Sequence, residues 1–114
     1  MFAIDIKQGV QILEAFCRKG SQLHVRGRIN GELAWSPAMI AKASDSKVCF
    51  KFFDTPGTEQ YECEISLAGS QMFYDPTGTT TWIGAGAYPW RSALRIAYRD
   101  GTDLVLGERD FGIQ

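Results

Sequence analysis

The spacing of the apolar residues changes once along this chain, and that change limits the folds open to it. Residues 6–19 show the 3.6-residue period of an amphipathic helix. From Gln22 onward the period is two, which is typical of half-buried strands. A helix followed by a long run of strands predicts an α+β fold, with the helix packed on a sheet. The helical stripe consists of Ile6, Val10, Leu13 and Cys17, widened by Ile12 and Phe16.

Both ends of the helix carry termination signals. Asp5 is followed three residues later by Gln8, which is the spacing of a capping box. Gly20 follows the last periodic residue and predicts the stop. Gly9 costs about 1 kcal/mol against alanine inside a helix, so we expect this helix to depend on docking against the sheet.

The first predicted hairpin admits two registers. A two-residue turn at residues 30–31, Asn-Gly, would place Trp35 opposite Arg26. A three-residue loop at residues 29–31 would pair Trp35 with Val25 instead. Because the second register sets apolar residues opposite one another, it is the one we expect.

The second hairpin has a single self-consistent register. Residues 56–57 are Pro-Gly, the favoured centre of a type II turn. Counting outward pairs Phe52 with Tyr61 on one face and Lys51 with Glu62 on the other. Apolar residues meet apolar ones and opposite charges meet. The same count places Cys63 inside and Cys49 outside.

A third hairpin and one further strand complete the pattern. A three-residue loop at residues 99–101 pairs Ile96 with Leu104. Residues 71–75 read as a short strand ended by Pro76. We therefore expect one domain over residues 1–114, with the helix packed on a mainly antiparallel, barrel-like sheet. Its six or seven strands lie within residues 22–110.

Composition narrows the class of protein. The 114 residues are 45% hydrophobic and 22% charged, as in ordinary globular domains. Charges interrupt the first twenty residues, so we expect a cytoplasmic protein with no membrane association. Three widely spaced cysteines and one histidine match neither a disulfide framework nor a zinc site, and we expect no metal or cofactor.

Positive charge is concentrated in the first half of the chain. Residues 1–53 hold eight Lys/Arg against four Asp/Glu, and residues 54–114 hold four against nine. Such an asymmetry can steer a charged partner. A basic strand face could also bind the phosphates of a nucleotide or nucleic acid. The basic set is Arg18, Lys19, His24, Arg26, Arg28, Lys42, Lys47 and Lys51.

An aromatic stretch, TTTWIGAGAYPWRS, spans residues 79–92. Its G-x-G lacks the third glycine of a dinucleotide fingerprint, and no P-loop lysine follows. Aromatic side chains in a loop rich in Gly and Pro can form a binding surface, although large aromatics also fill cores. Both interpretations stay open for Trp82 and Trp90.

The first two hairpins carry a pattern seen in small barrels. Trp35, Ala38 and Ile40 are followed by V-x-F-x-F-x-D over residues 48–54 and then by Tyr61. Over residues 22–75 this resembles Tudor-like, SH3-type barrels. The resemblance implies an aromatic cage that holds a methylated lysine or arginine by cation–π attraction. The matching cage positions are Trp35, Phe53, Asp54 and Tyr61.

Residues for catalysis are scarce. His24 is the only histidine and lies among strand residues. Cys49 lies near lysines that could lower its pKa, but no general base accompanies it. The PilZ type of cyclic-dinucleotide receptor also uses a small barrel and arginines, but its R-x-x-x-R signature is missing here.

These observations favour a non-enzymatic binding module that acts through a protein partner. Trp82, Tyr88 and Trp90 would form the recognition loop, and Arg26 and Arg28 would contribute steering. The alternative is phosphate binding by the basic strand face. Exposed edge strands leave a homodimer open as well.

Overall fold

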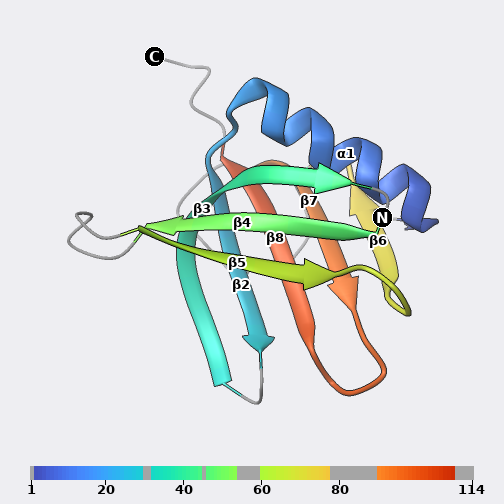
Figure 1. The fold of residues 1–114 in the computed structure, drawn as a ribbon. Helices are drawn as coiled ribbons and strands as arrows, with labels where there is room; N and C mark the ends of the chain where they lie inside the picture. Colours follow the sequence, from blue (N-terminus) through green and yellow to red (C-terminus); the bar gives the residue numbers. More distant parts are fainter. Residues whose placement is uncertain (1, 30–31, 45, 54–59, 78–89, 110–114) are drawn as a thin grey trace.

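The computed structural model describes residues 2–29, 32–44, 46–53, 60–77 and 90–109. These residues form one helix and eight strands (Figure 1). The elements in chain order are β1 (Phe2–Ile4), α1 (Ile6–Lys19), β2 (Leu23–Ile29), β3 (Glu32–Ser44), β4 (Lys47–Phe53), β5 (Gln60–Ser66), β6 (Gln71–Asp75), β7 (Trp90–Ala97) and β8 (Asp103–Arg109).

The helix begins and ends where the sequence predicts. The Asp5 carboxylate accepts a hydrogen bond from the Gln8 backbone N–H at 2.7 Å, and the Gln8 side chain accepts from the Asp5 N–H at 3.0 Å. This reciprocal pair is the capping box. Gly20 ends the helix in the left-handed region, with φ of 63°.

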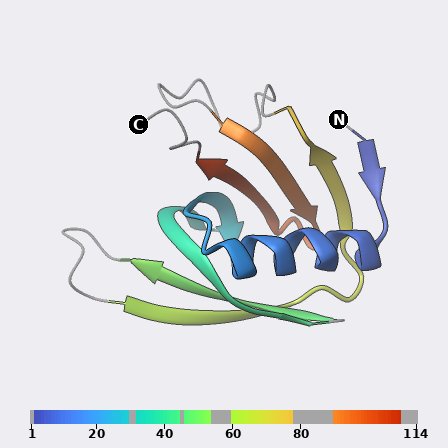
Figure 2. The same cartoon turned by 90° about the horizontal axis from the view of Figure 1, so that it is seen from above.

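The eight described strands form one antiparallel sheet with the order β1-β6-β7-β8-β2-β3-β4-β5. The α+β prediction is confirmed, and the strand number exceeds the predicted six or seven. In the described residues the sheet is open, with β1 and β5 as its edges, and is not the closed barrel that the pattern suggested. Figure 2 shows that α1 lies on the concave side, between the two halves of the sheet.

Strand β3 joins the two halves of the sheet. It is 13 residues long; its first part pairs with β2 and its second part pairs with β4. Ala38 belongs to both pairings, since its Cα partners are Leu23 and Phe52. A register shift between Ile40 and Lys42 adds a bulge, which bends a strand and increases its twist. The β3-β4-β5 half therefore crosses in front of the β2-β8-β7 strands (Figure 1).

The core lies on the concave side and draws on α1 and both halves of the sheet. Leu13, Leu23, Phe50, Leu94 and Leu104 have no exposed surface. Burying such a side chain contributes about 1.5–3 kcal/mol each. The helix is therefore held mainly by its apolar face, as expected from the helix-breaking glycine within it.

That glycine, Gly9, is buried against β6. A Cβ placed there would lie 1.9 Å from Sδ of Met72, whose side chain is itself buried. The missing side chain lets α1 approach β6 closely, so the loss in helix propensity is offset by packing.

The first hairpin does not have the expected register. Arg26 is the Cα partner of Trp35, and Ile29 is the partner of Glu32, so two residues separate the paired strands. The rejected Asn-Gly register is the correct one. Val25 has its apolar cross-strand partner in β8 instead, at Leu106, so β3 need not supply one.

The other two hairpins are confirmed. In the second, Phe52 pairs with Tyr61 and Lys51 with Glu62. Cys63 packs partly buried against the core, as expected for an inward position. The predicted turn of this second hairpin, at residues 56–57, lies outside the described residues. In the third hairpin, Ile96 pairs with Leu104.

Strand β1 was not predicted. Its three residues pair with β6, with Ala3 opposite Phe73.

In the part of the chain that the structure describes, no helix is both long and apolar enough to cross a membrane.

Candidate functional site

A row of side chains crosses the outer face of the sheet, the face turned away from α1 and the core. The register sets Arg26 of β2 beside Val105 of β8, Val105 beside Arg95 of β7, and Arg95 beside Phe73 of β6. We call Arg26, Phe73, Arg95, Asp103 and Val105 the outer-face patch. These positions alternate with inward residues of the core, such as Leu94 and Leu104, which is why they share the opposite face.

Arg95 organises the centre of this patch. Its Nη2 donates to Oδ2 of Asp103 at 2.7 Å, and its Nε donates to Oδ1 at 3.1 Å. The Arg95 guanidinium also lies over the Phe73 ring, 5.9 Å from the centroid. The hydrogen bonds from Arg95 to Asp103 raise the pKa of the guanidinium above its ordinary value. The arginine is thus fixed by a bidentate pair and an aromatic face, which costs less side-chain entropy on binding.

The patch combines apolar, aromatic and charged surface. Arg26, Phe73 and Arg95 are partly exposed, whereas Val105 retains only 7% of its surface. Arginine and aromatic residues are enriched at protein–protein interfaces. The carboxylate of Asp103 lowers the net positive charge of this surface.

The predicted basic set is divided between the two halves of the sheet. His24 and Arg26 are partly exposed on the outer face of β2, and Arg28 lies on the same strand. Lys47 pairs with Glu64 at 3.5 Å, and Lys51 lies opposite Glu62. The remaining members lie on α1, at Arg18 and Lys19, and on β3, at Lys42.

The predicted recognition loop falls largely outside the described residues. Trp82 and Tyr88 both lie there. Trp90 is the first residue of β7, and its Cα partner is Arg109.

The cage positions are not brought together as cross-strand partners. Trp35 pairs with β2, opposite Arg26, whereas Tyr61 pairs with β4, opposite Phe52. Phe53 ends β4, and the fourth position, residue 54, lies outside the described residues.

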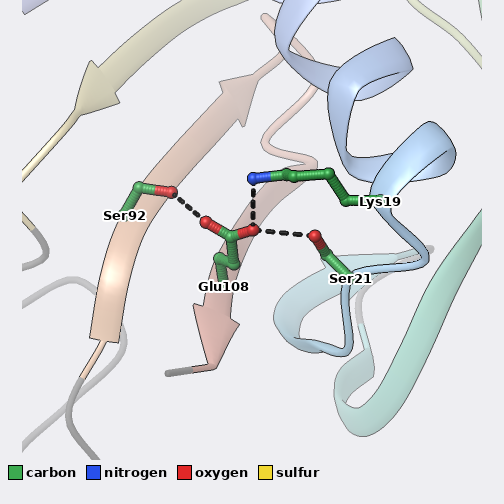
Figure 3. Close-up of polar contacts among 4 residues, drawn as sticks. All are labelled: Lys19, Ser21, Ser92 and Glu108. Carbon is green, nitrogen blue, oxygen red and sulfur yellow. Dashed lines mark hydrogen bonds and ion pairs between the residues drawn. The ribbon is translucent and has the colours of Figure 1, made fainter. Parts of the chain in front are cut away.

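A buried carboxylate that sequence reasoning missed lies where α1 meets β8 (Figure 3). Glu108 retains 4% of its surface. Its Oε2 accepts hydrogen bonds from Lys19 Nζ at 2.9 Å and from Ser21 Oγ at 2.7 Å, and its Oε1 accepts from Ser92 Oγ at 3.3 Å. The strand alternation Leu104, Leu106, Glu108 was the available signal, because it points the glutamate inward.

The electrostatics of Glu108 indicate a structural role. Burial alone would raise its pKa, but the hydrogen bonds from Lys19, Ser21 and Ser92 and the charge of Lys19 outweigh burial, and the pKa is lowered. A carboxylate that stays ionised with three donors has little capacity for general acid chemistry at neutral pH. We interpret the cluster as a tie between the helix end and β8.

Local contacts also explain two other side chains of types that can act in catalysis, Asp75 and Cys49. Asp75 is buried and accepts hydrogen bonds from the Thr77 backbone and hydroxyl, which closes the turn after β6. The pKa of Cys49 is raised, by desolvation and then by Glu62 and Glu64, and the opposing effect of Lys42 does not offset them. Among the described residues no group of His, Cys, Asp and Glu side chains is arranged to hold a metal ion.

A cleft of about 470 Å³ lies beside the exposed flank of α1. The described residues that line it are Lys7, Val10, Gln11 and Glu14. Their spacing along the helix places them on one flank, with buried Val10 at the base. This flank was not predicted as a site from the sequence.

Comparison with known proteins adds no relative to these observations. No family model matches the chain, no curated protein matches it, and no solved structure matches its fold. Function therefore has to be inferred from the residues themselves.

Proposed function

We propose that this chain is a non-enzymatic binding module that acts through a protein partner. The observation that carries the proposal is the outer-face patch, in which Arg26, Val105, Arg95 and Phe73 lie in one row across four strands. The sequence prediction of a recognition loop at Trp82, Tyr88 and Trp90 stays part of the proposal. The Tudor-like resemblance over residues 22–75 also remains a prediction, and the binding proposal does not depend on it.

The chemistry of the patch suits protein recognition. Phe73 offers aromatic surface and Arg95 offers a guanidinium held in place by Asp103. Residues of these types, when pre-organised, account for much of the binding energy at interfaces. Strands give such a surface a more rigid base than a loop does.

The proposal can be tested by site-specific crosslinking. A photoreactive phenylalanine analogue would replace Phe73 in the full chain, with the same analogue at exposed Lys42, in the β3-β4-β5 half, as the matched control. We expect a protein to be crosslinked from the Phe73 position alone. The captured partner, once purified, should bind Phe73→Ala and Arg95→Ala at least about tenfold more weakly, as expected for central interface residues.

Two results would contradict the proposal. One is equal crosslinking from Phe73 and Lys42, which would indicate nonspecific contact. The other is unchanged affinity of the purified partner for both alanine variants while circular dichroism shows a native fold.

Phosphate binding is a second candidate, favoured by one observation. His24 and Arg26 are partly exposed on the outer face that also carries Arg95. This candidate ranks lower because Asp103 already engages Arg95. It predicts that affinity for a nucleotide or oligonucleotide falls steeply with added salt, with a slope that reports the number of phosphates engaged. Affinity that is independent of salt would exclude it.

A further inference from the structure

Strand β5 forms the longer free edge of the sheet. The strand order ends at β5, so no described strand pairs with the side of β5 that faces away from β4. β5 has seven residues, whereas β1 at the opposite edge has three. An unpaired edge of this length presents backbone donors and acceptors to any extended segment that can pair with it.

The hydrogen bonds around β5 show which backbone groups face the open side. The Leu67 N–H donates to the Ser46 carbonyl at 2.7 Å, so Leu67 is directed toward the β4 side. The backbone N–H and C=O groups of successive residues in a strand alternate between its two sides. Those of Glu62, Glu64 and Ser66 are therefore directed away from β4. The Ser66 carbonyl accepts a hydrogen bond from the Tyr98 hydroxyl at 2.5 Å, which closes one end of the edge. The N–H and C=O groups of Glu62 and Glu64 remain directed to the open side.

The side chains of β5 define which segment would fit. Glu62 and Glu64 are exposed on the outer face, and Glu64 keeps 60% of its side-chain surface although it pairs with Lys47. On the inner face Cys63 and Ile65 are partly buried against the core. A strand added at this edge would therefore meet carboxylates on one face and apolar side chains on the other.

The pairing of β4 with β5 already illustrates this pattern. Lys51 of β4 lies opposite Glu62, Lys47 reaches Glu64, and Phe50 lies opposite Cys63. On β4, the strand already paired with β5, basic residues on the outer face thus alternate with apolar residues on the inner face.

We propose that the β5 edge binds an extended peptide segment in which Lys or Arg alternates with apolar residues, added as a further strand of the sheet. This inference rests on the proposed function, because the peptide segment would belong to the protein partner. It adds the sequence pattern that the partner would carry. A second copy of this chain fits less well. Two β5 strands related by a twofold axis would set glutamates of one copy opposite glutamates of the other, and like charges directly opposite are destabilising.

The acetylated and amidated hexapeptide KVKVKV serves as the probe. We expect it to bind the full chain and to slow hydrogen exchange at the amides of Glu62 and Glu64, because those N–H groups would enter a ladder. The peptide EVEVEV is the charge control. A KVKVKV peptide with N-methylated lysine backbones keeps the charges but removes the ladder donors, and we expect it to bind far more weakly.

Three variants test the surface from the protein side. Glu64→Gln should weaken KVKVKV binding about two- to fivefold, the effect of one opposite-charge cross-strand pair. Glu14→Gln removes the same charge from α1 and should leave binding unchanged. Glu64→Pro removes the outward donor without touching a bond to β4, and should abolish binding. Should Glu64→Pro fail to fold, hydrogen exchange at residues 62 and 64 of the natural chain decides the question.

Several outcomes would overturn the inference. These are no binding of KVKVKV at millimolar concentration, unchanged exchange at Glu62 and Glu64 in the bound state, equal binding of EVEVEV, or self-association of the chain through β5. A partner captured through Phe73 whose affinity is insensitive to Glu64→Pro would overturn this inference and leave the proposed function standing. Binding of KVKVKV without any effect of Phe73→Ala on partner capture would do the reverse.

Discussion

Nζ of Lys19 lies 2.9 Å from Oε2 of Glu108, joining the last turn of the helix to a strand near the other end of the chain. The lysine side chain is half exposed, whereas the glutamate side chain keeps 6% of its surface. The two partners are therefore unequal. Loss of the lysine leaves a buried carboxylate without its neutralising positive charge, whereas loss of the glutamate leaves a lysine that water can solvate.

Replacement of Glu108 should measure the strength of this tie. Glu108→Gln keeps the shape but loses the charge-assisted hydrogen bonds, and we expect the free energy of unfolding to fall by about 1.5–3 kcal/mol. Urea titration followed by tryptophan fluorescence provides the measurement. Lys19→Met should also destabilise the fold, and Arg18→Met, at the exposed neighbouring position of equal charge, is the control.

The same pair predicts a dependence on pH. The folded-state pKa of Glu108 lies below its ordinary value of 4.5, so the ionised form stabilises the fold. This contribution is fully present above the unfolded-state pKa and is lost as the pH falls through the folded-state pKa. We expect the stability difference between the natural chain and Glu108→Gln to shrink as the pH falls below about 4.5. Parallel stability curves over that range would contradict the assignment.

Gly9 should not tolerate a methyl group. Alanine would gain about 1 kcal/mol in helix propensity, but its Cβ would overlap Sδ of Met72. Overpacking of this kind typically costs about 1–3 kcal/mol, so we expect a net loss of stability for Gly9→Ala. In a Met72→Ala background the same substitution should become stabilising. Thermal unfolding of the four proteins gives the coupling directly.

Tyr98 should hold the end of β5 to the β7–β8 hairpin. Tyr98→Phe removes the hydroxyl that donates to the Ser66 carbonyl, at a cost of about 1 kcal/mol. Desolvation, followed by the charge of Asp100, raises the pKa of Tyr98 above its ordinary value of 10.0. The contribution is therefore present below the unfolded-state pKa and is lost as the pH rises through the folded-state pKa. Alkaline unfolding of natural and Tyr98→Phe chains, compared by circular dichroism, tests both statements, and identical curves would contradict them.

The recognition loop can be examined by fluorescence. In the free chain, we expect strong acrylamide quenching and red-shifted emission from variants that retain Trp82 or Trp90 as the single tryptophan, because a recognition loop faces solvent until its partner binds. Trp82→Ala combined with Trp90→Ala should then abolish partner capture and leave the fold intact. Blue-shifted, protected emission from both residues, or unfolding of the double variant, would assign the loop to the core instead.

Local signals explain which parts of the fold could be predicted. The capping box at Asp5 and Gln8, the helix stop at Gly20 and two of three hairpins depend on residues close in sequence. The predicted register of the first hairpin was wrong because it required β3 to supply the apolar partner of Val25. In the structure β8 supplies it, at Leu106. No local pattern contains that information.

The same limit applies to the candidate sites. The basic character of β2 could be predicted from the sequence. The row from Arg26 to Phe73 exists only because β2 pairs with β8, β8 with β7, and β7 with β6. Glu108 was overlooked because a charged residue at the end of a strand ordinarily reads as solvent-exposed. The strand alternation directs Glu108 inward, and the docking of α1 sets Lys19 beside it.

The β2–β8 pairing also has a consequence for synthesis of the chain. Among the described residues, five of the seven strand pairings join strands that are consecutive in sequence and can form as soon as both have left the ribosome. β2 can acquire its second partner only when residues 103–109 have emerged. Until then a strand carrying Leu23 and Val25 has one open side in the nascent chain. During the interval between translation of β3 and translation of β8, this open side of β2 is therefore exposed to aggregation.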